Sequence, residues 1–404
     1  MLMQPKLRFK QDDGSDFPDW EKSILGDYGK LIKGLIYSPK NIVENGLLVL
    51  RSSNVQNNIL VLTDNVFVNL KLNEYKLTKI DDIIICVRNG SKKFIGKNAI
   101  VKNQYLPTST HGAFMANFRG ESNKFVFQWF QTQIYKKHIW KNLGATINSI
   151  NNSDLKKFRT VFPLEPEQQK IASFLSSVDK KIELLTKKYE LLEKYKKGLM
   201  QKIFSQEIRF KQDDGSDFPD WEESFLEKKI FLQSGFPFKS KYFNGSDKKV
   251  LRIGDIKKNI RCELFKGIFT NEACEDKYKV NENDFVIALS GATFGKIGKV
   301  KDQEEYFINQ RVAAVRTKEN LEFFFQLFDS ELFKKYLLSV PSIGAQSNIS
   351  NGDIYKFSSF FPTVKEQQKI ASFLSALDKK IDLVKQQIEK TQTFKKGLLQ
   401  QMFI

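Results

Sequence analysis

The 404-residue chain carries 65 Lys and Arg against 47 Asp and Glu, and its formal net charge is +18. With 41% hydrophobic residues, including 36 Phe, it should not be disordered, and its length accommodates two or three domains with cores of their own. No apolar run reaches the roughly 18 residues that span a bilayer, and the N-terminus lacks the apolar stretch of a signal peptide, so we expect a cytoplasmic protein. The positive charge makes a polyanion, and first of all nucleic acid, the expected partner.

The first recognisable segment is a short prologue that occurs twice. Residues 8–21 read RFKQDDGSDFPDWE, and residues 209–222 repeat the same fourteen letters. The Asp-Gly-Ser within it is typical of a turn, and the Pro shortly before a Trp suits a buried aromatic anchor. We interpret the prologue as a structural clasp, because phosphate would repel its acidic loop. Docking of a partner protein is the alternative.

The segment after each prologue is variable but keeps shared landmarks. The apolar run 82–87 corresponds to 284–289, and each run suits a buried strand. A basic turn containing glycine follows each run, at 88–97 and 290–299, which predicts β-hairpins. Further short strands are expected at 47–50, 58–62, 250–253 and 312–315, and aromatic helical patterns at 124–138 and 321–338. Each half therefore contains a mixed domain rich in β structure.

Each half ends in a long amphipathic helix. Residues 167–204 and 366–403 both open with EQQKIASFLS, and their apolar positions step by four and three, which is the heptad seam of a coiled coil. A lysine breaks each seam, at Lys196 and Lys395. At 1.5 Å per residue each helix is roughly 55 Å long, so the simplest partner of one helix is the other. Two unrelated helices packed on separate domains are the alternative. The seam residues expected to pair the helices are Ile171, Leu175, Val178, Ile182, Leu185, Leu192, Ile370, Leu374, Leu377, Ile381, Val384 and Ile388.

These elements predict an α+β protein built as a tandem repeat with pseudo-two-fold symmetry. Two mixed α/β domains are joined by two long helices, which such a symmetry would run antiparallel as a coiled coil with a domain at each end. The expected divisions are a first domain at 1–161 with its clasp at 1–21, a long helix at 162–207, a second domain at 208–360 with its clasp at 208–222, and a long helix at 361–404.

The sequence offers little for catalysis or for metal binding. Its three cysteines show no CxxC spacing, and together with two histidines they form neither a disulfide framework nor a zinc site. The chain contains no Pro-Pro pair of the kind that a DNA methyltransferase motif needs, and the turn at 291–296 lacks the spacing and the Ser or Thr of a phosphate-binding loop. Neither a nucleophile constellation nor a carboxylate pair of a metal-dependent nuclease is apparent. We therefore expect no catalytic and no metal-binding residues.

The variable domains instead interleave basic residues with aromatic and amide side chains. Lysines there would mostly neutralise phosphates, whereas Arg, Asn and Gln could reach base edges in the major groove. The two basic turns suit a β-ribbon whose tip enters a groove. Ordinary solvation is the alternative for any single side chain. The candidate DNA-binding residues are Arg51, Arg88, Asn89, Lys92, Lys93, Lys97 and Arg119 in the first half and Lys239, Lys241, Arg252, Lys257, Thr293, Lys296, Asn309, Gln310 and Arg311 in the second.

Together these motifs resemble the specificity subunit of Type I restriction-modification systems. The resemblance spans essentially the whole chain and is carried by the repeated EQQKIASFLSxxDKKI helices, the Gly-Ala-Thr to Phe-Pro-Leu segment before the first of them, residues 236–240 with 250–253, and residues 290–296 with 309–311. It implies two target recognition domains, each of which reads one half of a split DNA site. It also implies docking of two methyltransferase subunits, with two restriction/translocase subunits joining for restriction.

The resemblance further implies that this chain binds no cofactor. S-adenosylmethionine, ATP and Mg²⁺ would belong to the partner subunits. The paired helices would then act as a ruler that sets the two half-sites about one helical turn apart, roughly 34 Å along the duplex. Because the two variable domains differ, the target would be asymmetric.

Two other classes of protein stay open at this point. A stand-alone DNA-binding nuclease would show cofactor-dependent cleavage by the purified chain. A coiled-coil adaptor would bind DNA without sequence preference and with only a weak dependence on salt, because few phosphates would be neutralised.

Overall fold

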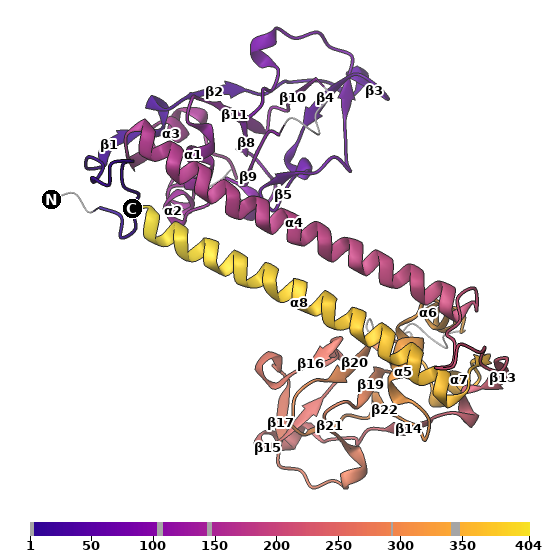
Figure 1. Ribbon diagram of the computed structural model, residues 1–404. Coiled ribbons are helices and arrows are strands. Elements are labelled where there is room, and N and C mark those ends of the chain that lie inside the picture. The colour runs from indigo at the N-terminus through magenta and orange to yellow at the C-terminus, as the bar shows by residue number, and fades with distance from the viewer. Residues whose placement is uncertain (1–3, 103–107, 144–147, 292–293, 341–347) are drawn as a thin grey trace. The chain divides into compact units, whose positions relative to one another are not determined.

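The chain divides into two compact units, both visible in Figure 1. Unit 1 comprises Met1–Thr186 and Gln386–Ile404, and unit 2 comprises Lys187–Lys385. The two long helices, α4 (Glu165–Phe204) and α8 (Val364–Met402), each contribute one part to each unit. The computed structural model describes residues 4–102, 108–143, 148–291, 294–340 and 348–404.

Unit 1 contains two four-stranded sheets. The first has the strand order β2-β11-β8-β9 and is antiparallel throughout. The second has the order β10-β4-β7-β3, with β10 parallel to β4. The pairs β1–β12 and β5–β6 complete the β structure of the described part of this unit. The strands are β1 (Glu21–Ile24), β2 (Lys30–Lys33), β3 (Ile42–Val43), β4 (Leu47–Leu50), β5 (Val55–Gln56), β6 (Ile59–Leu60), β7 (Phe67–Val68), β8 (Ile83–Cys86), β9 (Asn98–Ile100), β10 (Ser109–His111), β11 (Met115–Arg119) and β12 (Arg159–Phe162).

Strand β8 shows why the apolar run at 82–87 is continuous. Ile83 and Ile85 pack into an aromatic core beside the helices, whereas Ile84 and Cys86 pack against the second sheet. A strand that is covered on both faces needs an apolar side chain at every position, not at every second one. The predicted hairpin is confirmed, because β8 pairs antiparallel with β9. Gly96 in its turn has a φ of +82°, a left-handed conformation that favours glycine.

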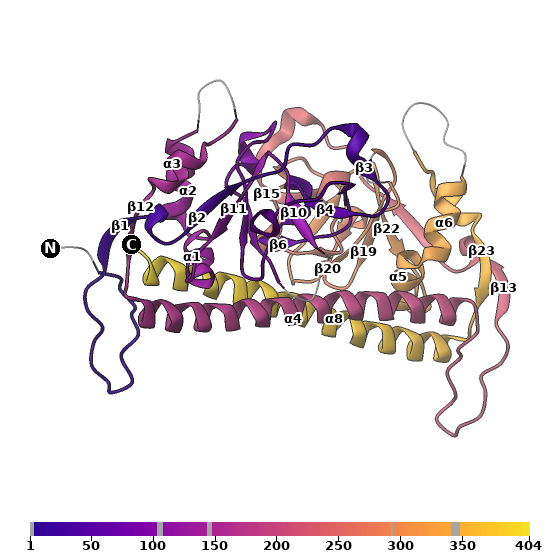
Figure 2. The same cartoon turned by 90° about the horizontal axis from the view of Figure 1, so that it is seen from above.

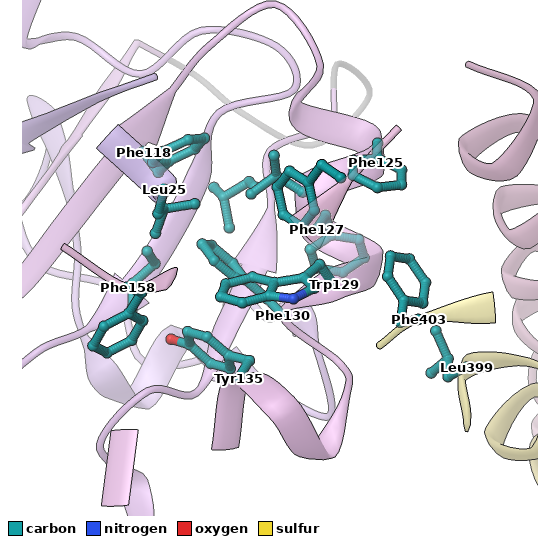
Figure 3. Close-up of a cluster of buried hydrophobic side chains, with 14 of the residues drawn as sticks. Leu25, Phe118, Phe125, Phe127, Trp129, Phe130, Tyr135, Phe158, Leu399 and Phe403 are labelled. Atoms are coloured by element: carbon teal, nitrogen blue, oxygen red, sulfur yellow. The ribbon is translucent and has the colours of Figure 1, made fainter. Parts of the chain in front are cut away.

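The aromatic core of unit 1 is completed by the C-terminal end of the chain. Figure 3 shows Phe403 and Leu399 beside Phe125 and Trp129 of helix α1 (Asn123–Trp129). The ring centroids of Phe125 and Phe403 lie 5.5 Å apart, and Phe403 is buried. Residues more than 270 positions apart in the sequence therefore share one core.

Unit 2 repeats this plan with different side chains. Its first sheet has the order β14-β22-β19-β20-β16, and its second has the order β17-β15-β21-β18 with β15 parallel to β21. Strand β19 is again buried on both faces, and it forms the predicted hairpin with β20. The strands are β13 (Glu222–Phe225), β14 (Phe231–Ser234), β15 (Phe243–Leu251), β16 (Asn259–Ile260), β17 (Ile268–Thr270), β18 (Lys279–Val280), β19 (Phe285–Ala288), β20 (Ile297–Val300), β21 (Tyr306–Ile308), β22 (Val312–Arg316) and β23 (Ser358–Phe361).

Each of the two aromatic helical patterns forms two consecutive helices. Thr132 accepts a hydrogen bond from the amide of Tyr135, and Ser330 accepts one from the amide of Phe333, so each hydroxyl starts a new helix. The short helices are α1, α2 (Gln133–Lys141) and α3 (Asn152–Lys156) in unit 1, and α5 (Leu321–Asp329), α6 (Glu331–Ser339) and α7 (Asn351–Tyr355) in unit 2.

The long helices pack together within each unit, and they run antiparallel there. In unit 1 Asp179 of α4 contacts Lys395 of α8, and Leu175, earlier in α4, shares a core with Leu399, later in α8. In unit 2 the corresponding ion pair joins Lys196 to Asp378. Of the residues predicted for the seam, Ile171, Leu175, Val178, Ile370, Leu374, Leu377, Ile381 and Val384 are buried, and Ile182, Leu185, Leu192 and Ile388 are half-buried.

The prologue acts as a clasp on the start of the long helix. The carboxylate of Glu167, which is fully buried, accepts hydrogen bonds from the Nε and Nη2 of Arg8 at 3.1 and 2.7 Å and from Trp20 Nε1 at 3.1 Å. Glu366 makes the same contacts in unit 2. In Figure 2 the acidic loop of each prologue extends to the side of the long helices away from the sheets of its own unit.

Candidate nucleic-acid interface

Three loops meet at one end of the sheets of unit 1. They follow β4, β8 and β10. The amide of Gly112 donates to the carbonyl of Leu50 at 2.9 Å, which ties the turn after β10 to the end of β4. The amide of Val87 donates to the carbonyl of Phe114 at 3.0 Å, which ties the same turn to the end of β8. We call this set of loops, residues 51–54, 87–97 and 112–114, the tip of unit 1.

Polar side chains hold the tip together. Asn89 donates from Nδ2 to Ser52 Oγ at 2.8 Å, and its Oδ1 accepts from the amide of Ser91 at 3.0 Å. Lys97 donates from Nζ to the carbonyls of Ser52 and Val55. Burial lowers the pKa of Lys97. These contacts give Asn89 and Lys97 a structural task at the tip in addition to any contact with a ligand.

Other predicted residues stand at the surface of the tip. Arg88 is exposed, and its guanidinium lies 5.5 Å from the ring centroid of Phe114. Lys92 and Lys93 are exposed in the turn between β8 and β9. Arg51 is half-buried and pairs with Asp64 at 2.8 Å. The tip therefore presents the side chains of Arg88, Lys92 and Lys93 to solvent.

Arg119 lies elsewhere. It ends β11, whose first residue follows the tip, so it stands at the opposite end of the strand. Its Nε and Nη2 donate to the carboxylate of buried Asp82 at 2.8 and 2.6 Å, and Nη1 and Nη2 also donate to the carbonyls of Tyr75 and Leu77. The hydrogen bond with Asp82 raises the pKa of Arg119. Because this guanidinium is already engaged on all sides, we leave it out of the interface.

His111 comes just before the tip but is fully buried. Its Nε2 lies 3.1 Å from the carbonyl oxygen of Ile32, and burial lowers the pKa of His111 to about 4. The ring is therefore neutral at pH 7 and faces the interior. It has no part in proton transfer to a ligand at the surface.

Unit 2 has a tip built from the corresponding loops, whose described residues are 252–255, 289–291, 294–296 and 309–311. The amide of Asn309 donates to the carbonyl of Leu251 at 3.0 Å, and the amide of Leu289 donates to the carbonyl of Arg311 at 2.9 Å. Gln310, Arg311 and Lys296 are exposed there. Arg252 is exposed as well and pairs with Asp255 at 3.4 Å. Thr293 lies outside the described residues.

The remaining candidates of unit 2 lie outside its tip. Lys257 is exposed, and its backbone lies against β20. Its carbonyl oxygen is so close to Gly298 that a Cβ added to this glycine would lie 2.4 Å from it. Lys239 and Lys241 are exposed before β15, and Lys241 lies 4.8 Å from the ring centroid of Tyr242. The structure thus places Arg252, Lys296, Gln310 and Arg311 on the loops of the tip and the three lysines outside it.

Sequence reasoning missed Phe114. Its ring is 57% exposed, and it occupies the place that Arg311 occupies in unit 2. The repeat offset is 202 residues at the buried strands β8 and β19 but 197 at this turn, so a constant offset does not align the two residues. The backbone hydrogen bonds of the turn give the correspondence directly.

The arrangement is typical of nucleic-acid-binding proteins. Two similar domains each present basic and amide side chains on loops at one end of their sheets. The family described as the Type I restriction modification DNA specificity domain matches residues 18–194 and 220–392, and the chain belongs to that family. It is therefore a specificity subunit of a Type I restriction-modification system, a DNA-recognition component and not an enzyme, with two domains suited to a bipartite site. It works on DNA within a restriction-modification complex.

Individual relatives cover nearly the whole chain. The Type I restriction enzyme MjaVIII specificity subunit of Methanocaldococcus jannaschii is 27% identical over 99% of this chain and 96% of its own length. The EcoKI specificity subunit of Escherichia coli is 23% identical over 91% of this chain and 84% of its own. The crystal structure of a Type I restriction-modification S subunit from M. genitalium has the same fold, with a TM-score of 0.64, 18% identity, and coverage of 100% of this chain and 99% of that one. No helix in the described part of the chain is long and apolar enough to cross a membrane.

Proposed function

We propose that each target recognition domain reads one half of an asymmetric bipartite DNA site through its tip. The observation that supports this most directly is the likeness of the two tips: their backbone hydrogen bonds correspond, and their exposed side chains differ. Two readers on one framework with different surface residues are suited to two different half-sites.

The paired helices would set the distance between the half-sites and dock two methyltransferase subunits. Two restriction/translocase subunits would join for cleavage. S-adenosylmethionine, ATP and Mg²⁺ would be held by those partners and not by this chain, and the complex would act in the cytoplasm. A change of length in one long helix should then change the spacing of the half-sites, because each helix contributes to both units.

Methylome sequencing tests the proposal. Cells that carry this chain with an active cognate methyltransferase subunit should show a split motif with methylated adenine in each half, and deletion of the chain should abolish it. Methylation that persists without the chain would refute the specificity role. Binding without sequence preference would favour the adaptor, and cleavage by the purified chain alone would favour the nuclease.

Inserting seven residues into one long helix tests the ruler. The insertion adds about two turns, or roughly 10 Å, and preserves the phase of the apolar seam. We expect the folded variant to show a shifted spacer or to lose its motif. An unchanged spacer, with helix content confirmed by circular dichroism, would contradict the ruler. Inserting seven residues into the acidic loop of one prologue is the control, and it should leave the spacer unchanged.

A further inference from the structure

The turn between β10 and β11 in unit 1 has a backbone frame that fixes where its side chains point. The amide of Met115 donates to the carbonyl of Gly112 at 2.9 Å, which closes the turn. The carbonyl of Phe114 accepts from the amides of Val87 and Arg88 at 3.0 and 3.1 Å, so the end of β8 holds the turn from one side. With its backbone held on both sides, Phe114 keeps its ring outside the protein.

The turn between β21 and β22 in unit 2 has the same frame. The amide of Val312 donates to the carbonyl of Asn309 at 2.8 Å, and the carbonyl of Arg311 accepts from the amide of Leu289 at 2.9 Å. Position 311 is therefore the structural counterpart of position 114. The two positions share the backbone hydrogen bond to the end of the buried strand and differ completely in side chain.

Neither side chain has a structural task that explains its exposure. Phe114 is 57% exposed and contacts only the guanidinium of Arg88 among the ring and cation pairs of the described residues. Arg311 is exposed, and within the described parts of the chain its guanidinium makes no hydrogen bond or ion pair. Exposure of an apolar ring to water is unfavourable, whereas contact with an apolar group of a bound polyanion would bury it. The cations of the tip would attract such a polyanion.

We infer that positions 114 and 311 are equivalent base-reading positions, one in each recognition domain, an assignment that rests on the proposed function. Arg311 reads a guanine through its O6 and N7 atoms, which match the two parallel donors of a guanidinium. Phe114 contacts the methyl group of a thymine, an apolar feature of the major groove that no other unmodified base offers. The neighbouring lysines of each tip position the duplex by its phosphates.

Methylomes of single variants test this inference, with the wild-type chain and the cognate methyltransferase in the same cells. Arg311→Ala should relax one guanine position in one half-site by 10-fold or more and leave the other half-site unchanged. Arg311→Gln should move the preference at that position towards adenine, because a carboxamide matches the N6 and N7 of adenine. Phe114→Ala should relax one thymine position in the other half-site, and Phe114→Leu should keep most of that preference.

Lys93→Ala and Lys296→Ala are the matched controls. Each should weaken binding of the assembled complex on all sequences and reduce the slope of log K against log salt by about one, with the motif unchanged. If Arg311→Ala behaves in this way, Arg311 contacts a phosphate and the inference is wrong for unit 2. If Phe114→Ala lowers methylation without altering the motif, the ring is a wedge between base steps and the inference is wrong for unit 1.

The two possible failures are distinguishable. If the wild-type chain directs no bipartite motif, the proposed function falls before any variant is compared. If it does so and both the Arg311→Ala and Phe114→Ala chains keep every base preference at full strength, the reading positions lie elsewhere on the tips. Circular dichroism of each purified complex confirms folding, which both substitutions should preserve because the side chains are exposed.

Discussion

Asp378 in α8 is the point at which three elements of unit 2 meet, and its charge should carry much of their stability. Its two carboxylate oxygens accept hydrogen bonds from Lys196 Nζ of α4, both at 2.7 Å. Gln326 of α5 donates to the same carboxylate at 2.8 Å. The side chain of Lys196 is 5% exposed and that of Asp378 is 16% exposed. The substitution Asp378→Asn keeps the shape of the side chain and removes the charge that Lys196 faces.

The loss of unfolding free energy in Asp378→Asn depends on the charges that remain around Lys196. Breaking a buried ion pair from one side costs about 3–5 kcal/mol, since a charge is left without its partner. Asp329 stays 3.8 Å from Lys196 Nζ and compensates part of this loss. Lys196 can also release its proton more readily than an exposed lysine, because burial lowers its pKa. We therefore expect Asp378→Asn to lower the free energy of unfolding by about 2–4 kcal/mol.

Urea unfolding followed by circular dichroism measures this, and unit 1 supplies the control. Asp179 and Lys395 form the corresponding pair at 2.6 Å, but the side chain of Asp179 is 34% exposed. Water screens that pair, so Asp179→Asn should cost only about 1 kcal/mol. The double variant Lys196→Met and Asp378→Leu removes both charges of the buried pair, and Lys258, which also pairs with Asp378 at 3.1 Å, keeps Asp329 at 3.3 Å. It should therefore be more stable than Asp378→Asn alone. The reasoning is refuted if Asp378→Asn costs less than Asp179→Asn.

Three further predictions concern the clasp, the chain terminus and acid. Glu167→Gln and its twin Glu366→Gln should each lower the melting temperature by a similar amount, because their contacts match; clearly unequal shifts would contradict the equivalence. Phe403→Ala should cost about 3–5 kcal/mol in urea unfolding as a buried ring is lost, whereas exposed Phe394→Ala should cost less than about 0.5. Burial raises the pKa of Asp378, but the charges of Lys196 and Lys258 outweigh this effect and lower that pKa overall. The stabilisation by Asp378 is therefore present above the ordinary carboxyl pKa near 4 and is lost as the pH falls through the lower folded value. The unfolding free energy of Asp378→Asn should consequently fall less steeply below pH 4 than that of the wild type, and parallel curves would exclude this origin.

Features that depend on the local periodicity of apolar residues could be predicted from the sequence. The long helices were expected at 167–204 and 366–403, and the structure has Glu165–Phe204 and Val364–Met402. The heptad seam and the continuous apolar strands also follow from spacing that a single stretch of chain displays. These patterns record which face of an element is buried, and burial is set locally by the period of the helix or strand.

Features that depend on distant contacts could not be predicted in this way. Nothing near Phe403 indicates that its ring completes the core around Phe125, because that pairing is decided by where α8 ends in unit 1. Arg119 matches a DNA-binding arginine by type and neighbourhood, yet buried Asp82 engages it. Phe114 was missed because apolar residues carry no charge signal and because insertions and deletions between the halves shift its counterpart out of the common offset.

Within each half, some parts tolerate substitution and others do not, and the contacts of each part explain why. The prologue is identical in both halves and contacts a fully buried glutamate, so a change there would leave a charge unpaired. At the tips, backbone hydrogen bonds hold the turns that carry positions 114 and 311, so these exposed side chains are free to differ at little cost to the fold, whereas Asn89 and Lys97 of unit 1 also tie its loops together. A new half-site therefore requires substitutions only at exposed tip positions, while the clasp and the helices that hold each domain stay as they are.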